Sequence, residues 1–174
     1  TLEALAAEGF PPEVLAALEG THVSLGASNA PTMSVVSGEE ADVAAFAAAA
    51  EARGWETKRL HISHASHSRM MDPILGAFGD VVRRVRLQPP TLPFVSNVTG
   101  TWMRAEDATE PEYWVRHLRS GVRFAEGIAT ILAGGPAACL CPLPAVSLWA
   151  PGLAAAAVVR VRARRQGGGA PRRA

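Results

Sequence analysis

The sequence His-Ile-Ser-His-Ala-Ser-His-Ser-Arg-Met-Met-Asp-Pro, from His61 to Pro73, holds three of the five histidines of this chain. Histidine takes up and releases a proton near neutral pH, because its unperturbed pKa is about 6.5. A histidine held in a fixed turn is therefore suited to act as a general base. By spacing alone, a hydrogen-bonded turn histidine with a purely structural role is the favoured interpretation.

Three further motifs follow along the chain. They are Ser-Asn-Val-Thr-Gly at 96–100, Tyr-Trp-Val-Arg-His-Leu-Arg at 113–119 and Val-Arg-Phe at 122–124. Together with His64-Ala65-Ser66-His67, they resemble the acyltransferase domains of modular polyketide synthases. The similarity extends from about Val14 to Leu132, and in that family the short histidine motif is His/Tyr-Ala-Phe/Ser-His.

The resemblance implies an α/β fold. It indicates the C-terminal portion of an α/β hydrolase-like acyltransferase core, with part of an inserted ferredoxin-like α+β subdomain. We expect residues 1–62 to belong to the small subdomain and residues 63–132 to return to the core. Residues 133–174, rich in Ala, Gly, Pro and Arg, would lie outside the family pattern as a disordered tail, encoded either by a shifted reading frame or as a genuine linker.

Local patterns predict the elements of the first sixty residues. Apolar spacing indicates helix over 1–19, broken at Phe10-Pro11-Pro12, and two paired strands over 23–27 and 33–36. Ser37 and Glu40 form a capping-box pattern that should begin a helix ending near Gly54. A strand should then occupy 55–62.

Proline positions delimit the later elements. Asp72 is a good N-cap with Pro73 at the first helical position, and the apolar residues from 74 to 85 keep helical spacing. The run 94–98 is short and apolar, which predicts a buried strand. A helix over 111–119 should pack through Trp114, Val115 and Leu118.

The resemblance assigns roles to four residues. His67 would be the general base that deprotonates the active serine, oriented by the backbone carbonyl of Asn97. His64 and Ser66 occupy the positions that select the extender unit: malonyl-type domains usually have His-Ala-Phe-His, and methylmalonyl-type domains Tyr-Ala-Ser-His. This chain combines His64 from the first with Ser66 from the second, so mixed selectivity is reasonable, because a methyl group contributes only about 1–3 kcal/mol of discrimination.

The family nucleophile lies in a Gly-His-Ser-x-Gly motif, and this sequence contains none. The resemblance therefore implies an acyltransferase whose nucleophile-bearing half is not in this chain. It implies no bound cofactor: the substrates would be malonyl- or methylmalonyl-CoA and the phosphopantetheine of an acyl carrier protein. Neighbouring ketosynthase and linker domains are the other expected partners.

Three alternatives remain open from the sequence. One is a metal site of His61, His64, His67, Cys139 and Cys141, which the spacing and the absence of a carboxylate disfavour. Another is a catalytically inert fragment, or an interaction module that uses the surface from 114 to 124. A third is a malonyl transacylase of the fatty-acid type.

Composition excludes other classes. All 16 acidic residues lie at or before Glu126, whereas the last 48 residues carry six arginines among Gly, Ala and Pro without aromatic neighbours, so we expect no nucleic-acid binding. Prolines interrupt the uncharged run 127–159, which argues against a membrane span. The chain has only two cysteines, Cys139 and Cys141, which gives no disulfide framework and favours the reducing cytoplasm. Four glutamates among the first twenty residues argue against a secretory leader.

Overall fold

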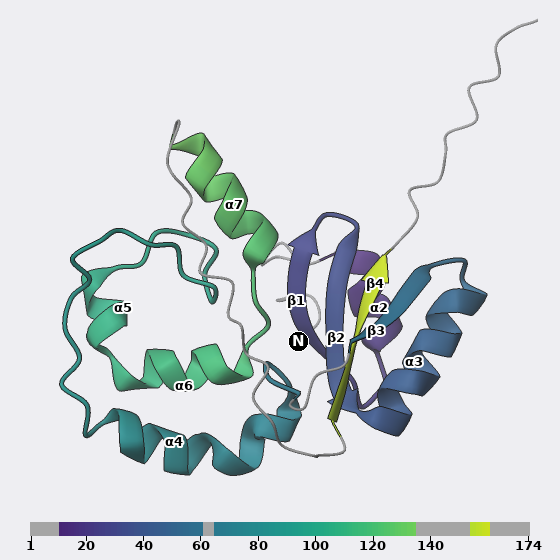
Figure 1. Ribbon diagram of the computed structural model, residues 1–174, viewed down its shortest axis with the longest axis horizontal. Coiled ribbons are helices and arrows are strands. Elements are labelled where there is room, and N and C mark those ends of the chain that lie inside the picture. The colour runs from purple at the N-terminus through teal and green to yellow at the C-terminus, as the bar shows by residue number, and fades with distance from the viewer. Residues whose placement is uncertain (1–10, 61–64, 135–153, 161–174) are drawn as a thin grey trace, which may run out of the picture.

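The computed structural model describes residues 11–60, 65–134 and 154–160 (Figure 1). Its first part alternates helices and strands: α2 (Pro12–Leu18), β1 (Ser24–Ala30), β2 (Met33–Glu39), α3 (Glu40–Ala52) and β3 (Glu56–Leu60). Its second part is helical: η1 (Arg69–Ile74), α4 (Leu75–Val82), α5 (Ala105–Thr109), α6 (Pro111–Arg119) and α7 (Phe124–Ala133). The strand β4 (Ala154–Arg160) joins the sheet of the first part.

The sheet has the strand order β1-β2-β4-β3, with every neighbouring pair antiparallel. The predicted hairpin is confirmed: β1 and β2 pair from Ser24↔Ser37 to Ala30↔Met33. Only Pro31 and Thr32 separate the two strands, so β1 extends further than its apolar run suggested.

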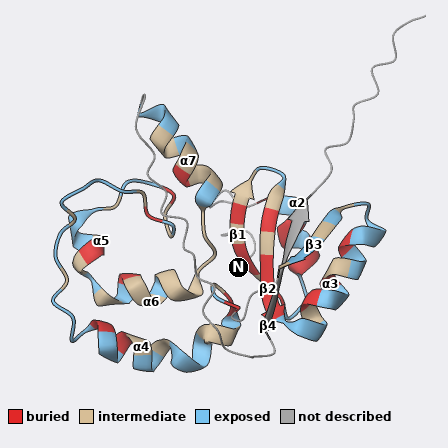
Figure 2. Ribbon diagram, in the orientation of Figure 1, coloured by how far each residue is buried: buried red, intermediate tan, exposed pale blue. Residues whose placement is uncertain are grey.

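The core of the first part lies where α2 and α3 cover the sheet (Figure 2). Its buried members are Val14, Leu15, Ala17, Leu18, Val23, Leu25, Val36, Val43, Phe46 and Ala50. The helices expected in these two regions are thus confirmed over 12–18 and 40–52, and their buried apolar residues face this core. Burying each large aliphatic or aromatic side chain contributes about 1.5–3 kcal/mol.

The predicted capping box at the start of α3 is wrong. Ser37 belongs to β2, where it pairs with Ser24 and is buried, so its hydroxyl is not available to the helix. Glu39 is the N-cap instead, and its side chain makes no capping hydrogen bond. The C-terminal end agrees with the prediction: the helix stops at Ala52, and Gly54 follows with φ +79°.

The start of the second part also differs from expectation. Asp72 is not an N-cap, because the chain forms the 3₁₀ helix η1 around it and Pro73. Ser68 caps η1 instead: its Oγ accepts the backbone N–H of Met70 at 3.1 Å. The carboxylate of Asp72 is used elsewhere and forms an ion pair with Arg119 at the end of α6.

Two predicted packing arrangements are not formed within the described residues. The run 94–98 makes one isolated bridge, Val95↔Trp102, because the Ser96 hydroxyl accepts the backbone N–H groups of Val98 and Thr99 and turns the chain. On α4, only Gly79 and Val82 are buried, since only one side of this helix meets α6. Apolar residues on the other side of η1, α4 and the turn that follows remain exposed: Ile74, Val81 and Val85.

The tail expectation is wrong for Ala154–Arg160, which forms β4 between β2 and β3. Backbone hydrogen bonds along both of its edges order this segment, and these bonds need no particular side chain. The rest of the predicted tail after Gly134 lies outside the described residues. No helix in the described ranges is long and apolar enough to cross a membrane.

The two parts meet at the segment between α6 and α7. The N–H of Val122 donates to the Gly26 carbonyl at 2.9 Å, and the N–H of Ser28 donates to the Val122 carbonyl at 2.8 Å. This short ladder attaches the C-terminal end of α6 to the edge strand β1. Nearby, the N–H of Arg69 donates to the Ser24 hydroxyl at 3.2 Å, so the chain after His67 is attached to the same strand.

Gly100 and Gly20 offer a matched test of backbone strain. Both have positive φ, +68° and +71°, but a Cβ at Gly100 would lie 2.8 Å from the Glu126 Cβ, whereas at Gly20 nothing lies within 4 Å. Arg123 holds Glu126 through hydrogen bonds of 3.0 and 3.1 Å, so Glu126 cannot easily move away. Gly20→Ala should lower the free energy of unfolding by about 1–2 kcal/mol.

Gly100→Ala should lower the free energy of unfolding by about 2–5 kcal/mol, because overpacking against Glu126 adds about 1–3 kcal/mol to the same backbone strain. Urea unfolding of both variants measures the difference. Equal losses would show that Glu126 does not press on Gly100.

Candidate functional site

His67 lies in a tight turn that leads into η1, with φ +59°, the only positive φ among non-glycine residues described. Its backbone N–H donates to the Leu118 carbonyl near the end of α6 at 3.1 Å. On either side, Ala65 and Ser68 are fully buried, and the Ser68 hydroxyl donates to the Ala65 carbonyl at 2.6 Å. A strained conformation maintained by such contacts is a common feature of functional sites.

The ring of His67 is held in one tautomer. Its Nδ1 lies 2.8 Å from the Ser120 carbonyl oxygen. A carbonyl oxygen can only accept a hydrogen bond, so Nδ1 carries the proton and Nε2 keeps its lone pair. Nε2 is thus the atom of His67 that can accept a proton, as the predicted role of general base requires.

The prediction that the carbonyl of Asn97 orients His67 is corrected by the structure. That carbonyl accepts the backbone N–H of Arg123 at 2.9 Å, and the carbonyl of Ser120 holds His67 instead. The segment 120–123 lies between His67 and Asn97. It accepts a hydrogen bond from His67 through Ser120 and donates one to Asn97 through Arg123. No side-chain chemistry in the sequence distinguishes one backbone carbonyl from another, although Ser120 follows directly after the predicted helix 111–119.

A second histidine, missed by the sequence analysis, lies beside the first. The rings of His67 and His117 meet edge to face with centroids 5.7 Å apart, and His117 stacks on Tyr113 at 6.3 Å. Helical spacing is the signal that was available, because Tyr113 and His117 are four residues apart and share one face of α6. The histidine in the motif Tyr-Trp-Val-Arg-His-Leu-Arg faces the site.

Both imidazoles favour the neutral form. Burial lowers the pKa of His67, and the backbone carbonyls of Ser120 and His117 oppose that shift. Burial also lowers the pKa of His117, and a positive charge on His67 would lower it further. A neutral His67 is the form that can accept a proton.

Helix α6 is fixed by polar contacts of its aromatic residues. The Tyr113 side chain is almost fully buried, and its hydroxyl shares a hydrogen bond with Ser96 Oγ at 2.6 Å. Trp114 Nε1 donates to the Ala108 carbonyl at 3.0 Å. We expected Trp114, Val115 and Leu118 to pack this helix, but Tyr113 is its most buried residue.

The other predicted site residues are only partly placed. Ser66 is exposed on the turn, and His64 lies outside the described residues. Of the residues in the alternative metal site, only His67 is described, and the described part of the chain contains no cluster of three potential ligands. The assignments of His64 and Ser66 as selecting residues stay predictions.

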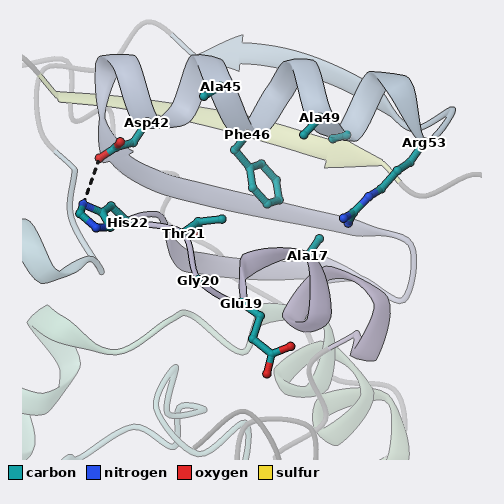
Figure 3. Close-up of a pocket in the computed structure, with 11 residues that line it drawn as sticks. Ala17, Glu19, Gly20, Thr21, His22, Asp42, Ala45, Phe46, Ala49 and Arg53 are labelled. Carbon is teal, nitrogen blue, oxygen red and sulfur yellow. Dashed lines mark ion pairs between the residues drawn. The ribbon is translucent and has the colours of Figure 1, made fainter.

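A cavity of about 450 Å³ lies between α2 and α3 (Figure 3). Phe46 points into it, and His22 and Asp42, 4.0 Å apart, lie at the end opposite Arg53. None of the predicted site residues is among those that line it. The predicted base His67 therefore lies away from this cavity, beside the end of α6.

The acyl transferase domain family matches residues 5–145. The chain belongs to this family. The match continues thirteen residues beyond Leu132. The described histidine turn, the Ser96–Gly100 turn and α6 all fall inside it.

Individual relatives agree. The spectinabilin polyketide synthase system protein NorB of Streptomyces orinoci is 41% identical over 134 residues, covering 77% of this chain and 6% of that protein. The acyl transferase domain of SpnD, solved with a 2-(pent-4-yn-1-yl)malonyl group, is 38% identical with a TM-score of 0.66, over 71% of this chain and 30% of that one.

The malonyl-CoA:ACP transacylase of Synechocystis sp. PCC 6803 is more distant, at 26% identity and a TM-score of 0.57, over 67% of this chain and 39% of that one. The chain thus spans less than half the length of both of these solved relatives. The predicted α/β acyltransferase fold is confirmed.

The lowered pKa of His117 gives a testable pH dependence of stability. Below about pH 6.5 the unfolded state binds a proton that the folded state does not, so stability is lost as the pH falls toward the folded pKa. The variant His117→Asn should lose less stability between pH 7 and pH 5 than the unmodified chain. Urea unfolding at both pH values measures this, and an equal loss would contradict the effect of burial on His117.

Proposed function

We propose that this chain provides the acid–base part of an acyltransferase site that transfers malonyl or methylmalonyl groups from CoA to an acyl carrier protein. The observation that carries the proposal is the hydrogen bond from His67 Nδ1–H to the Ser120 carbonyl, which leaves Nε2 free as a base. Membership of the acyl transferase domain family supports the reaction class.

In the first half-reaction, His67 Nε2 takes the proton of a serine hydroxyl as its oxygen attacks the thioester carbonyl. The tetrahedral intermediate then collapses, and the C–S bond breaks. The imidazolium returns the proton to the CoA thiolate, which leaves a seryl ester. The Ser120 carbonyl stabilises the imidazolium because it continues to accept from Nδ1.

The second half-reaction uses the same atom in the reverse direction. Nε2 takes the proton of the phosphopantetheine thiol as the sulfur attacks the ester, and returns it to the serine oxygen as the C–O bond breaks. No net proton is gained or lost by His67 over the cycle. The serine must come from polypeptide outside this sequence, which has no Gly-His-Ser-x-Gly motif.

We infer that the extender unit is malonyl or a small α-substituted malonyl. Ser66 is smaller than the Phe of malonyl-type domains and leaves space for a substituent. The similar SpnD domain was solved with a substituted malonyl group, which supports a tolerant pocket. The alternative of a strictly malonyl-specific, fatty-acid type transacylase has the Synechocystis relative in its favour, at lower identity.

A second candidate is a catalytically inert interaction module, favoured by the absence of a nucleophile motif from the sequence. In that case the neutral base beside Ser120 would have no reaction to perform. The two candidates differ in whether His67 matters once a nucleophile is supplied. A test of His67 in a complete domain therefore separates the two candidates.

A chimaeric acyltransferase, in which residues 11–134 replace the matching segment of a complete domain, tests His67. His67→Ala should slow both half-reactions by about 10²–10⁴, the usual contribution of a positioned acid–base group, as measured by chemical quench. His22→Ala is the matched control, because His22 is exposed beside the α2–α3 cavity and should leave the rates unchanged. Equal rates for the two variants would support the inert module.

Ser66 can be tested in the same chimaera. Ser66→Phe should shift the ratio of kcat/KM for malonyl-CoA over methylmalonyl-CoA toward malonyl by about tenfold, because the larger side chain occupies the space of the methyl group. Ser66→Ala is the control that keeps the space open. An unchanged ratio in Ser66→Phe would place selectivity elsewhere in the pocket.

A further inference from the structure

The reaction described above leaves the side chain of His117 without a role, although this side chain lies beside the base. Its ring centroid is 5.7 Å from that of His67, and the two ring planes are nearly perpendicular, at 84°. Tyr113, one helical turn earlier on α6, stacks on the same ring at 6.3 Å with an angle of 29°. Aromatic rings with centroids about 4.5–7 Å apart are in contact. The imidazole of His117 therefore fills the space between Tyr113 and the base.

The interactions of His117 involve its ring as a whole rather than its nitrogen atoms. The rings of His67, Tyr113 and Trp114 surround it, with Trp114 at 6.1 Å. Burial and the charge of His67 are the causes of the lowered pKa of His117, and no hydrogen bond to a described residue is among them. A carbon ring of similar shape would therefore make the same contacts.

The distance between the two histidine rings is fixed by the end of α6. The Leu118 carbonyl accepts the backbone N–H of His67 at 3.1 Å, so the turn that carries His67 is attached next to His117 in the chain. Tyr113 is almost fully buried, and its hydroxyl shares a hydrogen bond with Ser96 Oγ at 2.6 Å. Because both neighbours of the His117 ring are held in place, the ring occupies volume that water would otherwise fill beside His67.

We propose that His117 is a positioning residue for acyl transfer, whose ring packs against His67 and keeps water from that side of the base. Its effect on the rate rests on the proposed function, whereas the ring contact does not. Loss of water disfavours the charged form of an imidazole. Burial is likewise the largest cause of the lowered pKa of His67. A base that is neutral before the reaction can accept the serine proton.

Charged side chains on the neighbouring elements do not account for the neutral state of His67. On η1, α6 and the segment after α6 these side chains are Arg69, Asp72, Arg116, Arg119, Arg123 and Glu126. Asp72 pairs with Arg119, and Glu126 with Arg123. On α4 and α5, which contact α6, Arg83 pairs with Asp80 and Glu112, and Arg104 next to α5 pairs with Asp107.

The strands near the turn add little charge. β1 has no charged residue, and β2, which contacts η1, has only Glu39 at its end. None of these charged groups is among the causes of the pKa shift of His67, whereas burial and two backbone carbonyls are. The ring that lies against His67 is therefore the feature to test.

Histidine titration followed by NMR in the full chain tests the contact without any need for activity. In His117→Ala, water reaches the uncovered side of His67, so the pKa of His67 should rise and its titration midpoint should move to higher pH. His117→Phe keeps a ring but has no titratable nitrogen, so the midpoint of His67 should stay where it is in the unmodified chain. The exposed ring of His22 is the internal reference, and its titration curve should be the same in all three chains.

Two outcomes of the titration would overturn the proposal. If His117→Phe moves the midpoint of His67 as far as His117→Ala does, a nitrogen or the charge of His117 acts rather than its ring. If neither variant moves the midpoint, His117 does not keep water from His67.

Hydrogen exchange of the His67 amide, which is bound to the Leu118 carbonyl, reports whether the turn is intact. If His117→Ala has lost this protection, His117→Gln takes its place, because glutamine is a good helix former without a ring. His117→Gln must then move the midpoint of His67 to higher pH, and an unchanged midpoint contradicts the proposal.

The chimaeric acyltransferase connects the ring contact to catalysis. The acid limb of the pH profile of kcat/KM reports the pKa of the base in the free enzyme. In His117→Ala this limb should move to higher pH, so the loss of rate should be larger at about pH 6 than at about pH 8, while His117→Phe should keep the limb in place. An active chimaera whose acid limb stays fixed in His117→Ala contradicts the inference about His117.

A different result identifies a failure of the proposed function itself. If His67→Ala leaves the rates of the chimaera unchanged, His67 is not the base, and the role of His117 in catalysis fails with it. The midpoint of His67 would still move in His117→Ala in that case, because the ring contact does not depend on the reaction.

Discussion

The site depends on the C-terminal end of α6, which holds His67 at two points. The Leu118 carbonyl accepts the backbone N–H of His67, and the Ser120 carbonyl accepts the ring Nδ1–H. The first bond fixes a left-handed backbone conformation that would otherwise cost about 1–2 kcal/mol. The second fixes the tautomer, so a single short segment of backbone sets both the position and the chemistry of the imidazole.

Electrostatics at this point are balanced between two opposing effects. Burial lowers the pKa of His67, whereas carbonyl groups at the end of a helix carry partial negative charge and favour the imidazolium. A base for acyl transfer needs both effects: it must be neutral before the reaction and must hold a proton during it. His117 is buried against the same ring, and its proximity disfavours two positive charges there.

The helix that supplies these carbonyls is itself anchored at several places. Tyr113 is buried and shares a hydrogen bond with Ser96, Arg119 pairs with Asp72 of η1, and Glu112 pairs with Arg83 after α4 at 2.6 Å. The two ion pairs are exposed and contribute little by themselves. The buried Tyr113 side chain is therefore the main constraint on where α6 ends, and so on the position of His67.

The sequence by itself determined the elements whose signals are local and the family whose motifs are contiguous. The β1–β2 hairpin follows from two apolar runs around Pro31, and α6 begins at Pro111. Helix α3 ends just before Gly54, where the chain takes a positive φ that glycine adopts easily. His67 was singled out because the residues around it form a recognisable motif. Each of these features depends on residues close together in the chain.

Only the tertiary structure decided which distant groups meet. Ser120 rather than Asn97 orients His67, because backbone carbonyls are chemically alike and only the path of the chain selects one. Ser68 rather than Asp72 caps η1, because Asp72 is drawn to Arg119 from another helix. The strand at 154–160 carries no strong signal of its own, since its order comes from the backbone groups of β2 and β3 on either side.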